Sequence, residues 1–208
     1  HSYSVHYTKS FTINVEMKPG FGGLDITKLL TGSETAKVPA GTTFQVGINY
    51  TLPGGATVDT YPGWKAPGTV NQTHTGGDTS MTVTVGEKAV YDGTFPVGTV
   101  LTLSEDTATA SSTPAGVVWG SHTFTVGDQN TNSLTVEDQK STAVTLRNSA
   151  DPAAVEEGDF TVTKALAGDG DFSKSTFEFA YTCTDGTEGT LKAKADGEAV
   201  TGPKVPTG

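Results

Sequence analysis

Three polar residues occupy positions where the alternation of the surrounding segment predicts a buried side chain. The segment LDITKLL alternates apolar and polar residues, and Lys28 falls on its apolar side. The segment LTLSED places Glu105 on the side of its leucines, and VTLRNS places Asn148 on the side of its valine and leucine. Three predicted strands therefore each end an inward-facing apolar row with one polar residue: a lysine, a glutamate and an asparagine.

A buried charge without a partner costs several kcal/mol, so this set requires an explanation. In one arrangement, Lys28 and Glu105 form a buried ion pair and Asn148 completes its hydrogen bonds. In the other, burial favours the neutral amine and the protonated acid, and Lys28 attacks the side-chain carbonyl of Asn148 while Glu105 polarises it and shuttles protons. Ammonia would leave and an isopeptide bond would join the first strand to the last. We favour the cross-link, with Asp106 as the acid if the register is shifted by one residue.

The elements that must position these residues are predicted to be strands. The chain of 208 residues contains 26 Gly and 10 Pro, and short alternating or β-branched runs such as MTVTV, TVLTL, TFTV and AVTL are separated by turn residues. No long window has apolar residues at helical spacing. The pattern predicts an all-β protein built as an immunoglobulin-like sandwich.

An internal repeat predicts that this sandwich occurs twice. LDITKLL matches FTVTKAL, TFQVGINY matches TFEFAYTC, and FPVGT matches VPTG, in the same order. We expect a first domain at 21–150, a linker at 151–158 and a second domain at 159–208, with residues 1–20 as an N-terminal extension or strands of a preceding domain. The second copy carries Lys164 in place of the first lysine. It stops before the segments that would supply the glutamate and asparagine, so we expect it to be incomplete in this chain.

The three segments, in this order, resemble the Lys, Glu and Asn strands of the collagen-adhesin B-type (Cna B, prealbumin-like) domain. That immunoglobulin-like domain occurs in cell-wall-anchored adhesins and pilins of Gram-positive bacteria. More narrowly, FTVTKALAG, FEFAYTC and VPTG resemble a repeat of actinobacterial surface proteins. The resemblance implies a Lys28–Asn148 isopeptide bond assisted by Glu105. It also implies an unpaired Lys164 in the second copy, and a disulfide partner for Cys183 outside this chain.

The function expected from this reading is structural. The chain would be a stalk or repeat segment of an extracellular, cell-wall-anchored adhesin or pilus-like protein. It would need no cofactor and perform no catalysis beyond its own single-turnover cross-link. The incomplete second domain could self-associate through its exposed strand edges. Two alternatives stay open: a module that binds a glycan or host protein, and an accessory spacer of a secreted enzyme.

The loop YPGWKAPG carries the residues on which the binding alternative depends. Tyr61, Trp64 and Lys65 lie among Pro and Gly, and an exposed aromatic patch there would favour a ligand site. We favour packing of Trp64 over the edge of the sandwich. Trp119 is expected in the core.

Charge and composition argue against several other partners. The net charge is −10 and the pI about 4.7, and the lysines form no basic stripe, so nucleic acid and anionic membranes are poor partners. No apolar run approaches the roughly 18 residues of a membrane span. One cysteine excludes an internal disulfide, and the sequence DQNTN departs from a calcium loop, so we expect no metal site. We interpret His74 and His122 as solvated loop histidines.

Overall fold

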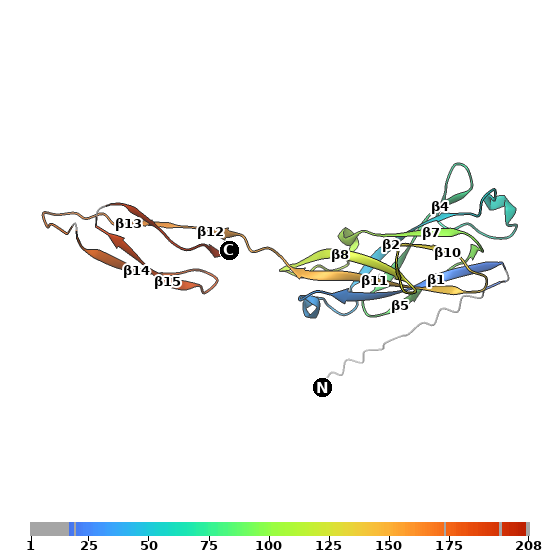
Figure 1. Cartoon of the computed structure of the whole chain (residues 1–208), viewed down its shortest axis with the longest axis horizontal. Coiled ribbons are helices and arrows are strands. Elements are labelled where there is room, and N and C mark those ends of the chain that lie inside the picture. Colours follow the sequence, from blue (N-terminus) through green and yellow to red (C-terminus); the bar gives the residue numbers. More distant parts are fainter. Residues whose placement is uncertain (1–16, 19, 173, 196, 207–208) are drawn as a thin grey trace, which may run out of the picture. The chain divides into compact units, whose positions relative to one another are not determined.

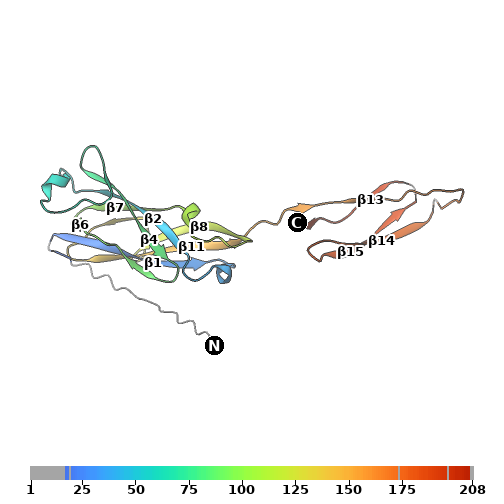
Figure 2. The ribbon, with the colours of Figure 1, turned by 180° about the vertical axis from the view of Figure 1, so that it is seen from behind.

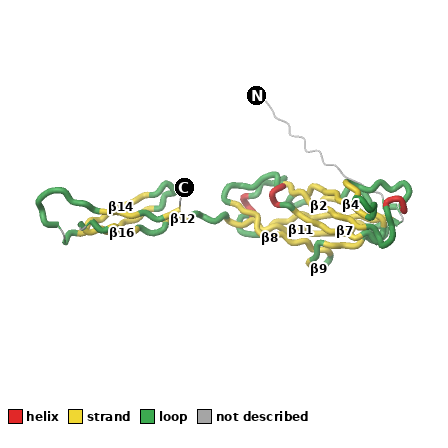
Figure 3. Tube along the Cα trace, turned by 90° about the horizontal axis from the view of Figure 1, so that it is seen from above, coloured by secondary structure: helices red, strands yellow, loops and turns green. Residues whose placement is uncertain are grey.

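The structure is a computed structural model, and it describes residues 17–18, 20–172, 174–195 and 197–206. Most of the predicted N-terminal extension, residues 1–20, lies outside the described residues. The chain divides into two compact units, His1–Pro152 and Ala153–Gly208. Both units are built from strands, and helical structure among the described residues is limited to short 3-10 turns (Figure 3).

The first unit is a sandwich of two β-sheets (Figure 1). One sheet has the strand order β5-β1-β11-β8-β9, with β6 also pairing to β1, and the other has the order β10-β7-β2-β4-β3. The bounds in the first sheet are β1 (Phe21–Thr31), β5 (Lys88–Val90), β6 (Phe95–Pro96), β8 (Val117–Val126), β9 (Gln129–Asn130) and β11 (Ser141–Pro152). The bounds in the second are β2 (Thr43–Thr51), β3 (Thr69–Val70), β4 (Gly76–Thr84), β7 (Val100–Glu105) and β10 (Ser133–Thr135). The 3-10 turns are Thr35–Lys37, Val58–Thr60 and Thr107–Thr109.

The hydrophobic core lies between the inner faces of the two sheets, as the alternation of the strands predicts. Its members include Leu24, Ile26, Phe44, Val46, Ile48, Tyr50, Leu101, Leu103, Phe124, Val144 and Leu146. Trp119 is partly buried at its margin, with its ring edge-on to Phe44 at 5.0 Å between centroids. The prediction of an all-β fold with an immunoglobulin-like sandwich is confirmed.

The first and last strands of this sandwich are neighbours and run parallel. The register of β1 on β11 extends from Gly23 opposite Ser141 to Thr31 opposite Ser149. Parallel neighbours cannot be joined by a tight turn, and here the rest of the unit forms their connection. Figure 2 shows β1 and β11 on one side of the sandwich and β2 and β7 on the other. This arrangement brings residues about 120 positions apart into contact.

Strand β11 extends further than the sequence predicted. Asp151 and Pro152, placed in the linker, continue β11 and pair with Val118 and Val117 of β8. A register irregularity between Asn148 and Ala150 lets the ladder continue beyond the polar end of the segment. The predicted linker therefore begins inside a strand.

The second unit consists of three two-stranded sheets, β12–β17, β13–β16 and β14–β15. The bounds are β12 (Glu157–Gly158), β13 (Thr161–Thr163), β14 (Thr176–Thr182), β15 (Glu188–Lys194), β16 (Ala199–Thr201) and β17 (Val205–Pro206). Among its described residues, Ala193 is the one buried hydrophobic residue. Its apolar side chains are therefore largely uncovered, in contrast to those of the first unit.

Candidate functional site: a buried lysine, glutamate and asparagine

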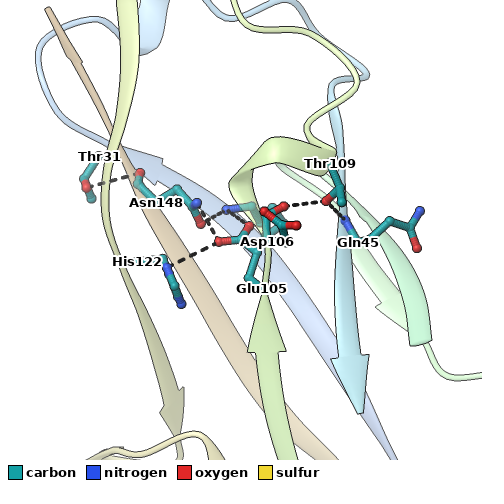
Figure 4. A network of polar contacts seen from close by, with 8 residues as sticks. Thr31, Gln45, Glu105, Asp106, Thr109, His122 and Asn148 are labelled. Atoms are coloured by element: carbon teal, nitrogen blue, oxygen red, sulfur yellow. Dashed lines mark hydrogen bonds and ion pairs between the residues drawn. The ribbon is translucent and has the colours of Figure 1, made fainter. Parts of the chain in front are cut away.

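The two sheets bring Lys28, Glu105 and Asn148 together inside the first unit. Lys28 on β1 and Asn148 on β11 are both 0% exposed. The parallel register pairs Leu30 with Asn148, so the asparagine side chain lies one step beyond Lys28 on the same inner face. Glu105 ends β7 in the opposite sheet, and its side chain is also 0% exposed. The three side chains that the alternation pointed inward therefore meet across the sandwich. Figure 4 shows Glu105 and Asn148 pointing toward each other.

The contacts between these side chains form a closed set. Lys28 Nζ donates a hydrogen bond to Asn148 Oδ1, and Asn148 Nδ2 donates to Glu105 Oε2 at 2.6 Å. Lys28 Nζ lies 3.6 Å from Glu105 Oε1, a buried oxygen that accepts no hydrogen bond from any described residue. The amine is thus held at the carbonyl group of the amide, and the carboxylate of Glu105 contacts both the amine and the amide.

The surroundings of Lys28 favour its neutral form. Its Nζ lies 4.3 Å from the centroid of the Phe44 ring, and Ile26 and Leu146 are fully buried beside it. Desolvation lowers the pKa of Lys28 from 10.5 to about 8, and attraction and hydrogen bonding to Glu105 oppose this shift. At pH 7 about one amine in ten would be neutral, compared with about one in 3,000 for an ordinary lysine. Burial therefore supplies the nucleophile that amide attack requires.

The alternative acid, Asp106, does not reach this site. Asp106 lies just past the end of β7 and caps the short turn Thr107–Thr109, where its Oδ1 accepts from the backbone N–H of Ala108 at 2.9 Å. Its side chain is exposed. The register of β7 makes Glu105 the acid of the buried set.

His122 is a member of the site that the sequence reading missed. The prediction of a loop is wrong, because His122 lies in β8 directly opposite Asn148 in the β11 register, although the residue is solvent-exposed as predicted. Its Nδ1 is 3.8 Å from Glu105 Oε2, and its side chain is 36% exposed. The spacing of His122 and Phe124 in SHTFTV was the available signal, since Phe124 is a core residue and shares its face. His74, by contrast, lies exposed in a turn with φ 58°.

The loop residues Tyr61, Trp64 and Lys65 are not part of this set. Trp64 is partly buried, with its Nε1 donating to Thr94 O at 2.8 Å and its ring 6.0 Å from that of Tyr61. Its packing against the core margin is the arrangement we favoured. Lys65 is exposed and lines, with Trp64, a hollow of about 800 Å³.

In the second unit, Lys164 aligns with Lys28 of the first copy, and Cys183 ends the segment TFEFAYTC, which aligns with TFQVGINY. Lys164 Nζ lies 4.8 Å from the centroid of the Phe177 ring, as Lys28 lies over Phe44 in the first unit. Cys183 follows β14 as a half-buried free thiol. Its pairing with a cysteine outside this chain stays a prediction.

The described residues contain no group of three or more His, Cys, Asp or Glu that could hold a metal ion. Within the same residues, no helix is long and apolar enough to cross a membrane.

The fold and the site together define a class: an immunoglobulin-like sandwich in which a lysine of the first strand, an asparagine of the last strand and a glutamate of the opposite sheet have buried side chains in contact. Residues 160–208 match a protein family described as a domain of unknown function, DUF5979. No curated protein sequence matches the chain.

Solved structures similar to this chain include two pilus proteins. A pilus-presented adhesin, Spy0125 (Cpa), is 18% identical with a TM-score of 0.37, and the match covers 64% of this chain and 28% of the adhesin chain. The major pilin protein T-13 from Streptococcus pyogenes is 14% identical with a TM-score of 0.31, covering 65% and 46% of the two chains. This chain thus spans less than half the length of either protein. These similarities concern the fold.

Proposed function

We propose that the chain is a structural segment of a bacterial cell-surface adhesin or pilus-like protein. Its first unit would be stabilised by an autocatalytic isopeptide bond between Lys28 and Asn148. The observation that carries this proposal is the contact of a buried amine with a buried amide carbonyl, with Glu105 touching both. The alternative is a Lys28–Glu105 ion pair whose hydrogen bonds Asn148 completes, and the loss of ammonia distinguishes the cross-link from it.

The cross-linking reaction conserves atoms and protons. The neutral amine of Lys28 attacks Cγ of Asn148 while protonated Glu105 donates to the carbonyl oxygen. The carboxylate then takes a proton from the attacking nitrogen and passes it to Nδ2. The Cγ–Nδ2 bond breaks, ammonia leaves, and the carbonyl oxygen returns its proton to Glu105 as the C=O bond forms again. Glu105 ends in the form in which it began, and the products are one secondary amide and one ammonia. Fixed positions and a water-poor site supply the acceleration.

The position of the bond suits a segment that carries tension. Force applied along the chain enters β1 near Phe21 and leaves β11 near Pro152, at opposite ends of the parallel pair. With a Lys28–Asn148 bond, the force would pass along eight residues of β1, through the bond, and along five residues of β11. Residues 29–147 would lie outside the load path. The bond would replace the hydrogen-bond ladder as the element that must break before the unit extends.

The surface location and the partners are part of the same proposal. They are supported by the resemblance of three segments to Cna B-type domains of cell-wall-anchored proteins. The acidic charge and the single cysteine fit an extracellular segment that binds no nucleic acid. The uncovered apolar faces of the second unit favour association with another strand-rich segment, including a second copy of this chain.

A peptide digest tests the proposed bond at the level of residues. Trypsin should not cleave after Lys28, because the amine of this residue is part of the bond. The digest should contain one branched product, in which the peptide with Lys28 is joined to the peptide with Asn148. Its mass should be one ammonia below the sum of these two peptides. Two separate peptides of unmodified mass would contradict the proposal.

The rate of cross-linking is expected to fall above about pH 8. In the reactive state Lys28 is neutral and Glu105 is protonated, and in the ion pair Lys28 is charged and Glu105 is a carboxylate. The two states differ only in which residue holds one proton. The fraction of chains in the reactive state is therefore independent of pH as long as that proton is bound. Above the Lys28 pKa of about 8 that proton is lost, and the rate should drop about tenfold per pH unit. The intact mass of freshly synthesised chain, followed over time at several pH values, measures the rate. A rate that rises through pH 8 and then levels off would show that Glu105 acts instead as a carboxylate base.

A ligand-binding role is the second candidate function. It is favoured by the hollow of about 800 Å³ beside the Trp64 loop, which also includes Phe21 and Asp92 in its lining. The partial burial of Trp64 and its hydrogen bond to Thr94 leave less exposed aromatic surface than a flat glycan platform would present. We therefore place this role second.

A further inference from the structure

His122 stands between the buried set and the surface of the first unit. Glu105 Oε2 accepts the hydrogen bond from Asn148 Nδ2 at 2.6 Å, and the same oxygen lies 3.8 Å from His122 Nδ1. The side chain of His122 is 36% exposed, whereas those of Glu105 and Asn148 are fully buried. A row of contacts thus leads from Asn148 Nδ2, the nitrogen that leaves during cross-linking, through Glu105 to the partly exposed His122. Figure 4 shows these three side chains next to one another.

A hollow of about 440 Å³ opens beside this row. Its lining residues are Leu103, Ser104, Glu105, His122, Thr123, Phe124, Asn130, Thr131 and Asn132. Glu105 and His122 are the titratable members of that lining. The hollow has room for ammonia or for a small planar ring, and its lining includes Glu105, whose side chain holds the leaving nitrogen.

We propose that His122 and this hollow form the proton-supply and exit route for the nitrogen that leaves Asn148. The inference rests on the proposed cross-link and adds a role that the buried set does not contain. The ring of His122 would pass a proton through Glu105 Oε2 to the departing nitrogen and regain one from solvent. The balance is one amine, one amide and one proton consumed, with one isopeptide bond and one ammonium ion formed.

Proton supply matters because ammonia is a base that can attack the new bond or remain in the site. Conversion to ammonium at the mouth of the hollow makes its departure irreversible in practice, since a cation does not return to an apolar core. The distance of 3.8 Å exceeds a direct hydrogen bond, and acid–base contacts of this kind commonly tighten during reaction. His122 is therefore a positioning and relay residue for the acid.

The charged groups around His122 are compatible with this role. Glu105 faces it from β7, and Lys28 on β1 lies behind Asn148. Arg147 on β11 is exposed and pairs in register with Thr123, so it belongs to the opposite face of that sheet. Asn130 and Asn132 contribute uncharged amides to the lining. The alternative is a packing role, because the ring of His122 lies edge-on to Phe124 at 5.9 Å.

Chemical rescue separates these two roles. His122→Ala should slow cross-linking of freshly synthesised chain about a hundredfold, the lower end of the range for acid–base catalysis. Added imidazole should restore the rate through the vacated hollow. Pyrazole, a ring of the same shape that is a much weaker base and does not take up a proton near neutrality, should not. His122→Phe fills the space and should be slow without rescue. His74→Asn, at an exposed turn that asparagine tolerates, is the matched control and should react like the wild type.

Each outcome bears on a different claim. Wild-type chain that never loses ammonia would refute the cross-link itself. Wild-type chain that reacts, beside His122→Ala that reacts equally fast, would refute the role of His122 alone. A slow His122→Ala variant that responds identically to imidazole and pyrazole would assign the residue to packing. Thermal unfolding of His122→Ala in a Lys28→Met background, compared with Lys28→Met alone, checks that the fold survives.

Discussion

Glu105→Gln is expected to yield a protein that keeps its ammonia and unfolds far more easily than the wild type. Glutamine preserves the shape of the side chain, but an amide cannot shuttle the proton that amide exchange needs. The variant would lose a cross-link between residues 120 positions apart, worth about 5 kcal/mol by analogy with a disulfide closing a loop of that length. It would also leave Lys28 buried without a carboxylate, which adds to the loss.

Two measurements test this prediction together: denaturant unfolding gives the stability, and intact mass shows whether ammonia has been lost. The matched control is Glu137→Gln, which removes an exposed carboxylate paired with Lys140. This variant should still lose one ammonia, and its stability to denaturant should be close to that of the wild type. A Glu105→Gln protein that is lighter than its sequence by one ammonia would contradict the role assigned to the acid.

The second large effect is expected under mechanical force. If Lys28 and Asn148 are bonded, pulling on the two ends of the chain cannot extend the residues between them. The Lys28→Met variant lacks the bond, so unfolding of its first unit should release about 400 Å of additional contour length, from roughly 3.3–3.6 Å per residue over 120 residues. Methionine keeps most of the buried volume of the lysine stem, so the difference should not arise from a cavity.

Single-molecule extension measures that increment directly. Lys140→Met is the control, because Lys140 is an exposed lysine on the same unit and its removal leaves the cross-link in place. An extension of about 400 Å in the wild type, equal to that of Lys28→Met, would show that the load is carried by hydrogen bonds alone.

The inward positions of the site could be predicted because strand alternation is a local property. Lys28, Glu105 and Asn148 each follow two apolar residues at a spacing of two, and all three are buried as that spacing requires. The choice of Glu105 over Asp106 also follows from this parity. The direct contact of the three side chains depends on the pairing of β1 with β11, which the sequence indicates only through the resemblance to a known domain.

Recognising His122 requires that the strand containing TFTV extend back through His122. The run TFTV is evidently β-forming, whereas VVWGSH contains glycine and polar residues that resemble a loop. The ladder with β11 extends β8 back to Val117, and Asn148 is the residue that pairs with His122. Tertiary pairing outweighs local propensity here. The same extension explains why Asp151 and Pro152 belong to β11 rather than to a linker.

The second unit illustrates a different limit. The alternating segment TFEFAYT forms β14 as its pattern indicates, and Lys164 lies over Phe177 as the alignment of the two copies suggests. Local pattern does not determine which surface covers the apolar side of these strands. Residues such as Phe177 and Phe179 are only half-buried in the described structure, although they align with core residues of the first unit.

The most direct test of the central claim is the intact mass of the purified wild-type chain beside that of Lys28→Met. The account predicts a wild-type mass below that of its sequence by one ammonia, and a Lys28→Met mass equal to that of its sequence. A wild-type mass equal to that of its sequence would contradict the isopeptide bond, and the buried lysine would then be an ion-paired residue of the core.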